Sequence, residues 1–177
     1  MRKQTGFTLV ELIIVIVILG ILAVTAAPKF LDLQGDANAS TIQGVAGAID
    51  SAGSISYGKA VIAGLQKTAA AATNVIDDGN GNDITLNYGY PTADVAGLGV
   101  ALDISLDSTT PYNGSDFNFV AISGTPNVAY IFANGSTTPT GSNDTAICAV
   151  RYTEATASSA TPPVFGAAAT QVFTGGC

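Results

Sequence analysis

An unbroken apolar run near the N-terminus limits the folds open to this chain more than any other feature. The run extends from Phe7 to Ala27, and Glu11 is its only ionisable side chain. As a helix, these roughly 21 residues are about 31 Å long, which matches the hydrocarbon thickness of a bilayer. The run therefore predicts a helix that can span a membrane.

Basic residues flank the run on both sides. Arg2 and Lys3 precede it, and Lys29 follows it. Because flanking positive charges favour the cytoplasmic side, we expect the short N-terminus in the cytoplasm and the C-terminal bulk outside. A secretory signal has a shorter apolar core followed by a small-residue cleavage site, whereas here the small residue, Gly6, precedes the run. The pattern therefore differs from a conventional secretory signal.

Glu11 needs a physical explanation because it lies inside the apolar run. An ionised carboxylate in a bilayer is costly unless it is paired, so such a residue is a functional candidate. One explanation is local: the carboxylate caps its own helix, where the dipole favours negative charge by about 0.3–1 kcal/mol. The other is a positively charged partner on a neighbouring molecule. The two explanations are compatible.

The composition argues against several classes of function. The sequence contains no histidine, so serine–histidine–aspartate triads, cysteine–histidine dyads and histidine zinc sites cannot be built. The formal net charge is −7, which disfavours binding to nucleic-acid phosphates. We therefore expect a protein that is not an enzyme, needs no cofactor and does not bind nucleic acid.

Cys148 and Cys177 are the only cysteines in the sequence. An even pair predicts a disulfide formed in an oxidising compartment, and two buried free thiols are the alternative. The enclosed segment is poor in large apolar residues, so we expect it to have little core of its own. A disulfide would staple this loop and stabilise the protein by about 3–4 kcal/mol in the chain-entropy account.

After Pro28, the sequence predicts an amphipathic helix that continues to residue 60. Pro28 should kink the helix, and the glycines between residues 35 and 53 weaken it. Ser40 and Gln43 have the spacing of a capping box, which leaves open a second helix start there. Apolar residues recur at the three- and four-residue steps of one helix face. They are Phe30, Leu33, Ala37, Ile42, Val45, Ala46, Ile49 and Ala52.

The rest of the chain, residues 61–177, predicts a connecting loop followed by an antiparallel sheet. Residues 61–83 are first alanine-rich and then rich in turn-forming residues. Later segments rich in β-branched and aromatic residues are separated by Asn, Gly, Pro, Ser and Thr clusters. These segments are ITLNYGY (84–90), FNFVAIS (117–123), NVAYIFA (127–133), AICAVRYTE (146–154) and TQVF (170–173). With the long helix, they predict an α+β fold.

The stretch DDGNGND is a weak candidate for calcium binding. Asp78, Asn80 and Asn82 alternate as the oxygen ligands do at the start of an EF-hand loop. The sixth position is Asp83 instead of glycine, and the twelfth is Gly89 instead of glutamate. Because clustered Asp, Asn and Gly also form ordinary turns, we favour a turn over a metal site.

The segment G-FTLVELIIVIVILGILAVTAAP, residues 6–28, resembles the leader junction and N-terminus of type IV pilins and related pseudopilins. In that family a prepilin peptidase cuts after the glycine and methylates the new N-terminus. The resemblance therefore implies removal of residues 1–6 after Gly6 and N-methylation of Phe7. It also implies that the new amino group of Phe7 pairs with Glu11 of a neighbouring subunit during assembly.

The same resemblance implies the type IV pilin fold, in which a long N-terminal hydrophobic helix packs on an antiparallel β-sheet. Residues 7–28 correspond to the transmembrane and fibre-core half of the helix, and residues 29–60 to its amphipathic half. Residues 61–177 correspond to the globular head. Its C-terminal disulfide loop is 148–177, which in the family forms an exposed, variable face.

As a type IV pilin, the chain would polymerise through its helix into a surface fibre for adhesion, attachment and biofilm formation. It would be a single-pass inner-membrane protein before assembly and part of an extracellular pilus afterwards. Its implied partners are copies of itself, prepilin peptidase and the pilus assembly machinery, with a surface carbohydrate as candidate receptor. The stretch CAVRYTEAT and the terminal GGC look most similar to the mannose-sensitive haemagglutinin class of major pilin.

Two other functions are compatible with the sequence. A type II secretion pseudopilin shares the N-terminal segment but builds a short periplasmic piston. A membrane-anchored enzyme or receptor would make Glu11 incidental, and it would require a catalytic or binding site that the sequence does not display. An extracellular fibre distinguishes the pilin from the pseudopilin, and activity in a soluble fragment without the apolar run would support the enzyme.

Overall fold

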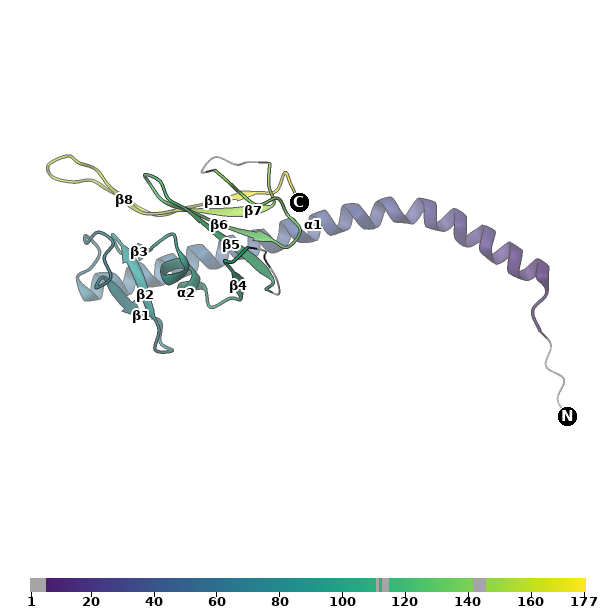
Figure 1. The fold of residues 1–177 in the computed structure, drawn as a ribbon, viewed down its shortest axis with the longest axis horizontal. Helices are drawn as coiled ribbons and strands as arrows, with labels where there is room; N and C mark the ends of the chain where they lie inside the picture. The colour runs from purple at the N-terminus through teal and green to yellow at the C-terminus, as the bar shows by residue number, and fades with distance from the viewer. Residues whose placement is uncertain (1–5, 111, 113–114, 142–145) are drawn as a thin grey trace. The chain divides into compact units, whose positions relative to one another are not determined.

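A computed structural model describes residues 6–110, 112, 115–141 and 146–177 of the chain (Figure 1). The chain divides into two compact units, Met1–Ala37 and Asn38–Cys177. The long helix α1 begins in the first unit and ends in the second. All the strands that the structure describes belong to the second unit.

Helix α1 extends from Leu9 to Ala63. The helical backbone continues through Pro28, Gly35 and Gly44, so the second helix start considered at Ser40 is wrong. The local capping spacing is overridden because Ile42, Val45 and Ile49 are buried, and this burial stabilises the helix beyond its intrinsic propensity. The kink at Pro28 stays a prediction.

Gly64 closes the C-terminus of α1, slightly beyond the predicted end at residue 60. Its φ is +74°, a left-handed conformation that glycine adopts without steric cost. The amide of Leu65 donates to Ala60 O at 2.8 Å, and the amide of Gly64 donates to Val61 O at 3.2 Å. This Schellman arrangement satisfies carbonyl groups that the end of a helix leaves free.

The second unit is built around a five-stranded sheet with the order β10-β7-β6-β5-β4. Its strands are β4 (Leu106–Asp107), β5 (Phe117–Ile122), β6 (Val128–Ala133), β7 (Ala149–Thr153) and β10 (Ala169–Phe173). Neighbouring strands are antiparallel except β4 and β5, which are parallel. The sheet is therefore mixed at one edge, whereas the sequence predicts an antiparallel sheet.

Two smaller antiparallel sheets complete the β-structure. They are β1 (Val75–Asp77), β2 (Asp83–Asn87) and β3 (Tyr90–Pro91), and the ribbon β8 (Thr156–Ala157) with β9 (Phe165–Gly166). A π-helical turn η1 (Val95–Gly99) and a short α2 (Val100–Leu102) lie between β3 and β4. Strand β1 lies in a segment predicted to be loop, and it is stabilised because Ile76 packs with Ile84 and Leu86.

In the second unit, the apolar face of α1 packs on one face of the five-stranded sheet (Figure 1). Ile42, Val45, Ala46 and Ile49 of the helix are buried in one cluster with Phe119, Ala129, Ile131, Val150 and Tyr152 of the sheet. A second cluster contains Val128, Tyr130 and Phe132 of β6 with Phe173 of β10. The fold is α+β, with a long N-terminal apolar helix and antiparallel and mixed sheets.

The strand segments predicted from the sequence are all confirmed, but the segment 148–177 contains more structure than predicted. Strand β10 pairs with β7 over its whole length, from Ala169 opposite Thr153 to Phe173 opposite Ala149. Strands β8 and β9 form a ribbon in the middle of the same segment. Main-chain hydrogen bonds hold these strands, so a composition poor in large apolar side chains does not reveal them.

Candidate functional site

The first turn of α1 contains the only acidic residue of the apolar run. Glu11 Oε2 accepts hydrogen bonds from both the amide and the hydroxyl of Thr8, each at 2.8 Å. In return, the amide of Glu11 donates to Thr8 Oγ1 at 3.3 Å. This reciprocal pattern is a capping box, which satisfies amide groups that would otherwise lack partners at a helix N-terminus.

The capping box shows how Glu11 is arranged in a single chain. Both hydrogen bonds from Thr8 end on Oε2, and within the described residues Oε1 accepts none. Local capping is therefore the observed arrangement, and one carboxylate oxygen remains open to a further donor. Pairing with the amino group of a neighbouring Phe7 stays a prediction.

Gly6 and Phe7 precede the helix, lie outside any helix or strand and are exposed. The side chain of Phe7 is 91% exposed, and a Cβ added to Gly6 would meet nothing within 4 Å. The junction between them is thus open to an enzyme. Residues 1–5 of the expected leader lie outside the described residues, and cleavage after Gly6 stays a prediction.

The span that follows, Leu9–Ala26, is long and apolar enough to cross a membrane. Its large apolar side chains are all exposed, from 49% at Val15 to 77% at Val24. The span also contains the polar residue Thr25, whose hydroxyl donates a hydrogen bond to Leu22 O of the same helix at 3.0 Å. Such a surface is unfavourable in water, because burying each of these side chains would stabilise the protein by about 1.5–3 kcal/mol.

Comparison with known proteins identifies the N-terminal segment. Residues 1–27 match the family model of the prokaryotic N-terminal methylation motif. The chain carries this motif. The type IV narrow pilus major component PilA5 of Thermus thermophilus is 51% identical over 50 residues. The match covers 28% of this chain and 43% of that relative, so the chain spans less than half of the relative's length.

No solved structure matches this chain. The motif, the N-terminal apolar helix and the α+β architecture are consistent with the type IV pilin fold. They fit a precursor that is anchored in a membrane by its N-terminal helix. The more specific likeness to the mannose-sensitive haemagglutinin class stays a prediction.

Cys148 and Cys177 form a disulfide, so the alternative of two free thiols is wrong. The bond joins the chain just before β7 to the chain after β10, beside the pair formed by Ala149 and Phe173. Close to it, the amide of Gly176 donates to Ile147 O at 3.2 Å. Because Cys148 is fully buried and Cys177 packs against the core, the disulfide secures the end of the chain to the main sheet.

The stretch DDGNGND forms the turn between β1 and β2. Asp78 accepts hydrogen bonds from the amides of Asn80 at 2.7 Å and Asn82 at 3.0 Å, and from the Asn82 side chain at 2.9 Å. These hydrogen bonds, that of the Asn82 side chain first, lower the pKa of Asp78. The carboxylate is thus engaged by the turn itself, which supports the turn interpretation over the calcium candidate.

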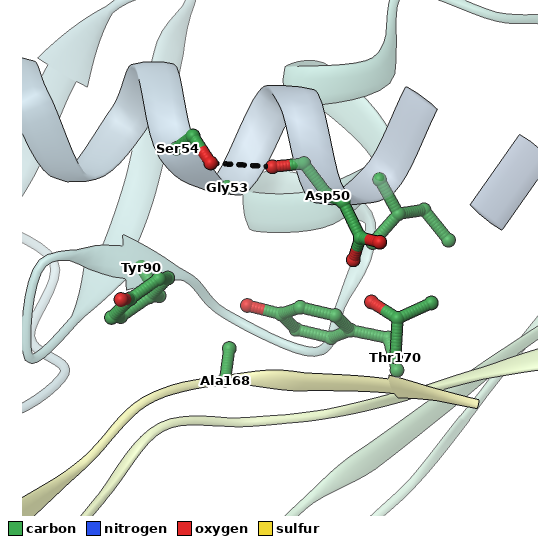
Figure 2. A pocket seen from close by; sticks show the side chains of 8 residues that line it. Asp50, Gly53, Ser54, Tyr90, Ala168 and Thr170 are labelled. Atoms are coloured by element: carbon green, nitrogen blue, oxygen red, sulfur yellow. Dashed lines mark hydrogen bonds between the residues drawn. The ribbon is translucent and has the colours of Figure 1, made fainter. Parts of the chain in front are cut away.

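A pocket of about 250 Å³ lies between α1 and strands β3 and β10 (Figure 2). Asp50, Gly53 and Ser54 line it from the helix, with Tyr90 and Thr170 among the residues that line it from the sheets. Figure 2 shows the carboxylate of Asp50 directed into the space above Thr170. The Ser54 hydroxyl donates to the backbone oxygen of Asp50 at 2.9 Å, so it is engaged by its own helix.

Two buried polar residues, one in β7 and one directly after it, were not predicted from the sequence. Glu154 accepts hydrogen bonds from the Ala93 amide at 3.1 Å and the Asn127 side chain at 2.8 Å. The Tyr152 hydroxyl donates to Pro91 O at 2.7 Å, and burial, followed by the charge of Glu154, raises its pKa. Each of these two contacts, Glu154 with Ala93 and Tyr152 with Pro91, joins residues 61 positions apart in the sequence. The only local signal was a charged residue at the end of an apolar strand segment.

Proposed function

We propose that this chain is the structural subunit of a type IV pilus. The observation that carries the proposal is the exposed apolar span Leu9–Ala26 within the N-terminal methylation motif. A membrane covers such a surface before assembly, and the same surfaces of other copies can cover it within a fibre. The relative that matches this segment is itself named a major component of a type IV pilus.

In this proposal, prepilin peptidase removes residues 1–6 and methylates Phe7. The new amino group is protonated near neutral pH. When a subunit moves from the membrane into the fibre, this amino group pairs with Glu11 of a neighbouring subunit. Glu11 supplies its Oε1 atom, while Oε2 can retain the bonds from Thr8. An unpaired charge in an apolar environment is unfavourable, so the pairing favours one axial register.

The proposed role is structural and not catalytic. The hydroxyl of Ser54 in the pocket beside Tyr90 and Thr170 donates to the helix backbone. The sequence contains no histidine that could act as a general base. Among pilin classes, the C-terminal disulfide segment favours a major pilin over a type II secretion pseudopilin. The mannose-sensitive haemagglutinin class and a surface carbohydrate receptor are the finer form of this proposal, and they rest on the sequence resemblance.

Processing is tested by the intact mass of the subunit in sheared surface fibres. The expected mass is that of a chain beginning with N-methyl-Phe7. A fibre subunit that retains Met1, or one that begins after Ala27, would contradict the proposal. Absence of the chain from sheared fibres, with the protein confined to the periplasm, would favour the pseudopilin.

Assembly is tested by Glu11→Ala and Glu11→Gln, co-expressed with the wild-type chain. Both variants should enter the membrane and be processed, but they should be under-represented in fibres because the incoming amine finds no carboxylate. Thr25→Ala is the matched control, since Thr25 is a polar residue of the same span whose hydroxyl bonds only its own helix. If Glu11→Ala is present in equal proportions in fibres and membrane, the pairing with Phe7 is contradicted, and helix capping is the only role left for Glu11.

A further inference from the structure

The aromatic residues of the second unit fall into two groups. One group packs in the core: Tyr112, Phe117, Phe119, Tyr130, Phe132, Tyr152 and Phe173. The remaining four, Tyr57, Tyr88, Tyr90 and Phe165, belong to none of the core clusters. All four instead line one pocket of about 150 Å³. Core packing therefore does not account for them.

The four rings form two pairs contributed by separate parts of the fold. Tyr57 of α1 stacks on Tyr90 of β3, with ring centroids 4.9 Å apart. Tyr88 and Phe165 of β9 lie 5.4 Å apart with their planes tilted by 53°. Tyr57 and Phe165 are each 37% exposed. The walls of the pocket are thus aromatic surfaces that remain accessible to a ligand.

The backbone is strained to place one of these rings. Tyr88 and Gly89 form the two-residue turn between β2 and β3, with φ of +50° and +86°. Such a turn favours Asn or Asp followed by Gly, and a bulky residue with positive φ is a true outlier. Gly89 also gives Tyr57 room, because a Cβ there would lie 2.9 Å from the Tyr57 ring. Strain of this kind is a reason to look for function.

Two polar residues line the same pocket. Lys67 is exposed and brings a positive charge. The side-chain oxygen of Gln66 is buried and has no hydrogen-bond partner among the described residues. The pocket therefore combines aromatic faces with one exposed cationic group, and the Gln66 oxygen is buried in its wall.

We propose that this pocket binds a zwitterionic quaternary ammonium group, specifically phosphocholine. Aromatic rings attract quaternary ammonium ions because the ring quadrupole makes each ring face electrostatically negative. Lys67 disfavours a simple cation but would pair with a phosphate attached to it. The volume is below the roughly 300–1,000 Å³ of sites for drug-sized ligands, which suits a small head group.

This site is independent of the proposed pilus function, and binding to the full chain can be measured without fibres. The probe is phosphocholine, added to the full chain in a detergent that contains no choline. We expect binding with a Kd on the order of 1 mM, detected by saturation transfer to the choline methyl protons. Choline should bind more weakly than phosphocholine, and inorganic phosphate and a neutral hexose should not compete.

Aromatic variants separate ligand binding from folding. Tyr57→Leu keeps an apolar side chain but removes the π-face, and it should weaken phosphocholine binding about 5- to 30-fold. Ile62→Ala is its control, because Ile62 lies on the same helix, is 89% exposed and does not line the pocket. Tyr88→Asn suits the positive φ of the turn, so it should keep or raise the unfolding midpoint while weakening binding.

The role of Lys67 is tested with Lys67→Gln. This variant should bind phosphocholine several-fold more weakly and choline no more weakly than the wild type. Lys59→Gln makes the same charge change outside the pocket, since Lys59 donates to Asp77 O, and it should leave both affinities unchanged. Equal weakening by the two lysine variants would overturn the zwitterionic assignment.

Nanodiscs distinguish a lipid head group from phosphocholine presented in solution. If phosphatidylcholine discs, but not phosphatidylglycerol discs, block the binding of added phosphocholine, the source is the bilayer surface. If added phosphocholine binds equally in both, the source is soluble or displayed on another surface. The proposal is overturned if wild type and Tyr57→Leu bind phosphocholine equally, or if only the neutral hexose binds in a Tyr57-dependent manner.

Discussion

Two stretches of helix α1 share a backbone conformation but differ in the surroundings of their apolar side chains. In Leu9–Ala26 the large apolar residues are exposed, and in Ile42–Ile49 those at helical spacing are buried. The second stretch is stabilised within the chain by the five-stranded sheet. The apolar side chains of the first stretch are not covered by any described part of the chain. They must therefore be buried by lipid or by other copies of the chain. Folding and assembly thus depend on different parts of one helix.

Loss of the disulfide should have the largest effect on the second unit. Replacing both Cys148 and Cys177 by alanine should lower the free energy of unfolding by about 3–4 kcal/mol, because the unfolded chain gains the freedom of a 29-residue separation. Urea unfolding of the chain in detergent, followed by near-ultraviolet circular dichroism, measures the change. Cys148→Ser alone should lower subunit abundance and piliation. An unchanged unfolding curve for the double variant would contradict this account.

A matched pair of substitutions tests the contrast between the two stretches directly. Ile49→Ala leaves a cavity in the core and should lower the free energy of unfolding by about 3 kcal/mol. Leu19→Ala, at a residue 58% exposed, should change it by less than about 0.5 kcal/mol. Both are measured by urea unfolding in detergent. A comparable loss for Leu19→Ala would mean that the apolar span packs within the single chain.

Tyr152→Phe should have an intermediate effect, confined to the second unit. It leaves Pro91 O without its buried donor and should lower the free energy of unfolding by about 1–3 kcal/mol. The pKa of Tyr152 is raised in the folded chain. The stability that this provides is present below the unfolded pKa of about 10 and is lost as pH rises further. The variant should therefore lose less stability above that pH than the wild type.

The comparison for Tyr152→Phe is made by urea unfolding at neutral pH and at alkaline pH. Tyr90 also has a raised pKa, caused first by burial, and it is retained in the variant. Some alkaline destabilisation should therefore remain. Identical pH dependence in wild type and variant would show that Tyr152 does not contribute to it.

Thr8→Ala should have the smallest effect, at the start of the apolar span. It removes the hydroxyl that donates to Glu11 Oε2 and accepts from the Glu11 amide, but keeps the bond from the Thr8 amide to Oε2. The loss should cost the first helical turn about 1 kcal/mol. Amide hydrogen exchange of the first turn in micelles should quicken, while exchange in the sheet should not change. Protection of the first turn equal to wild type would mean that the surroundings, and not the capping box, order the helix start.

The sequence predicted much of the fold because the decisive signals were local. The apolar run of Leu9–Ala26, the amphipathic spacing from Ile42 to Ile49 and the main strand segments could each be recognised from composition and periodicity. Thr8 and Glu11 also have capping-box spacing, a more specific local signal than the general helix cap predicted for Glu11. Strand β1 and the parallel edge strand β4 were not predicted, because they are only three and two residues long.

The sequence alone determined that an apolar helix with one acid precedes a β-rich region, and that the only two cysteines enclose its end. Local period, charge and composition are sufficient for those conclusions. The tertiary structure decided that Glu154 is buried against Ala93 and that Tyr57, Tyr88, Tyr90 and Phe165 line one pocket. These residues are distant in sequence, and no local pattern records which strands and turns bring them together. Their positions follow from sheet order and turn geometry, which only the packed chain defines.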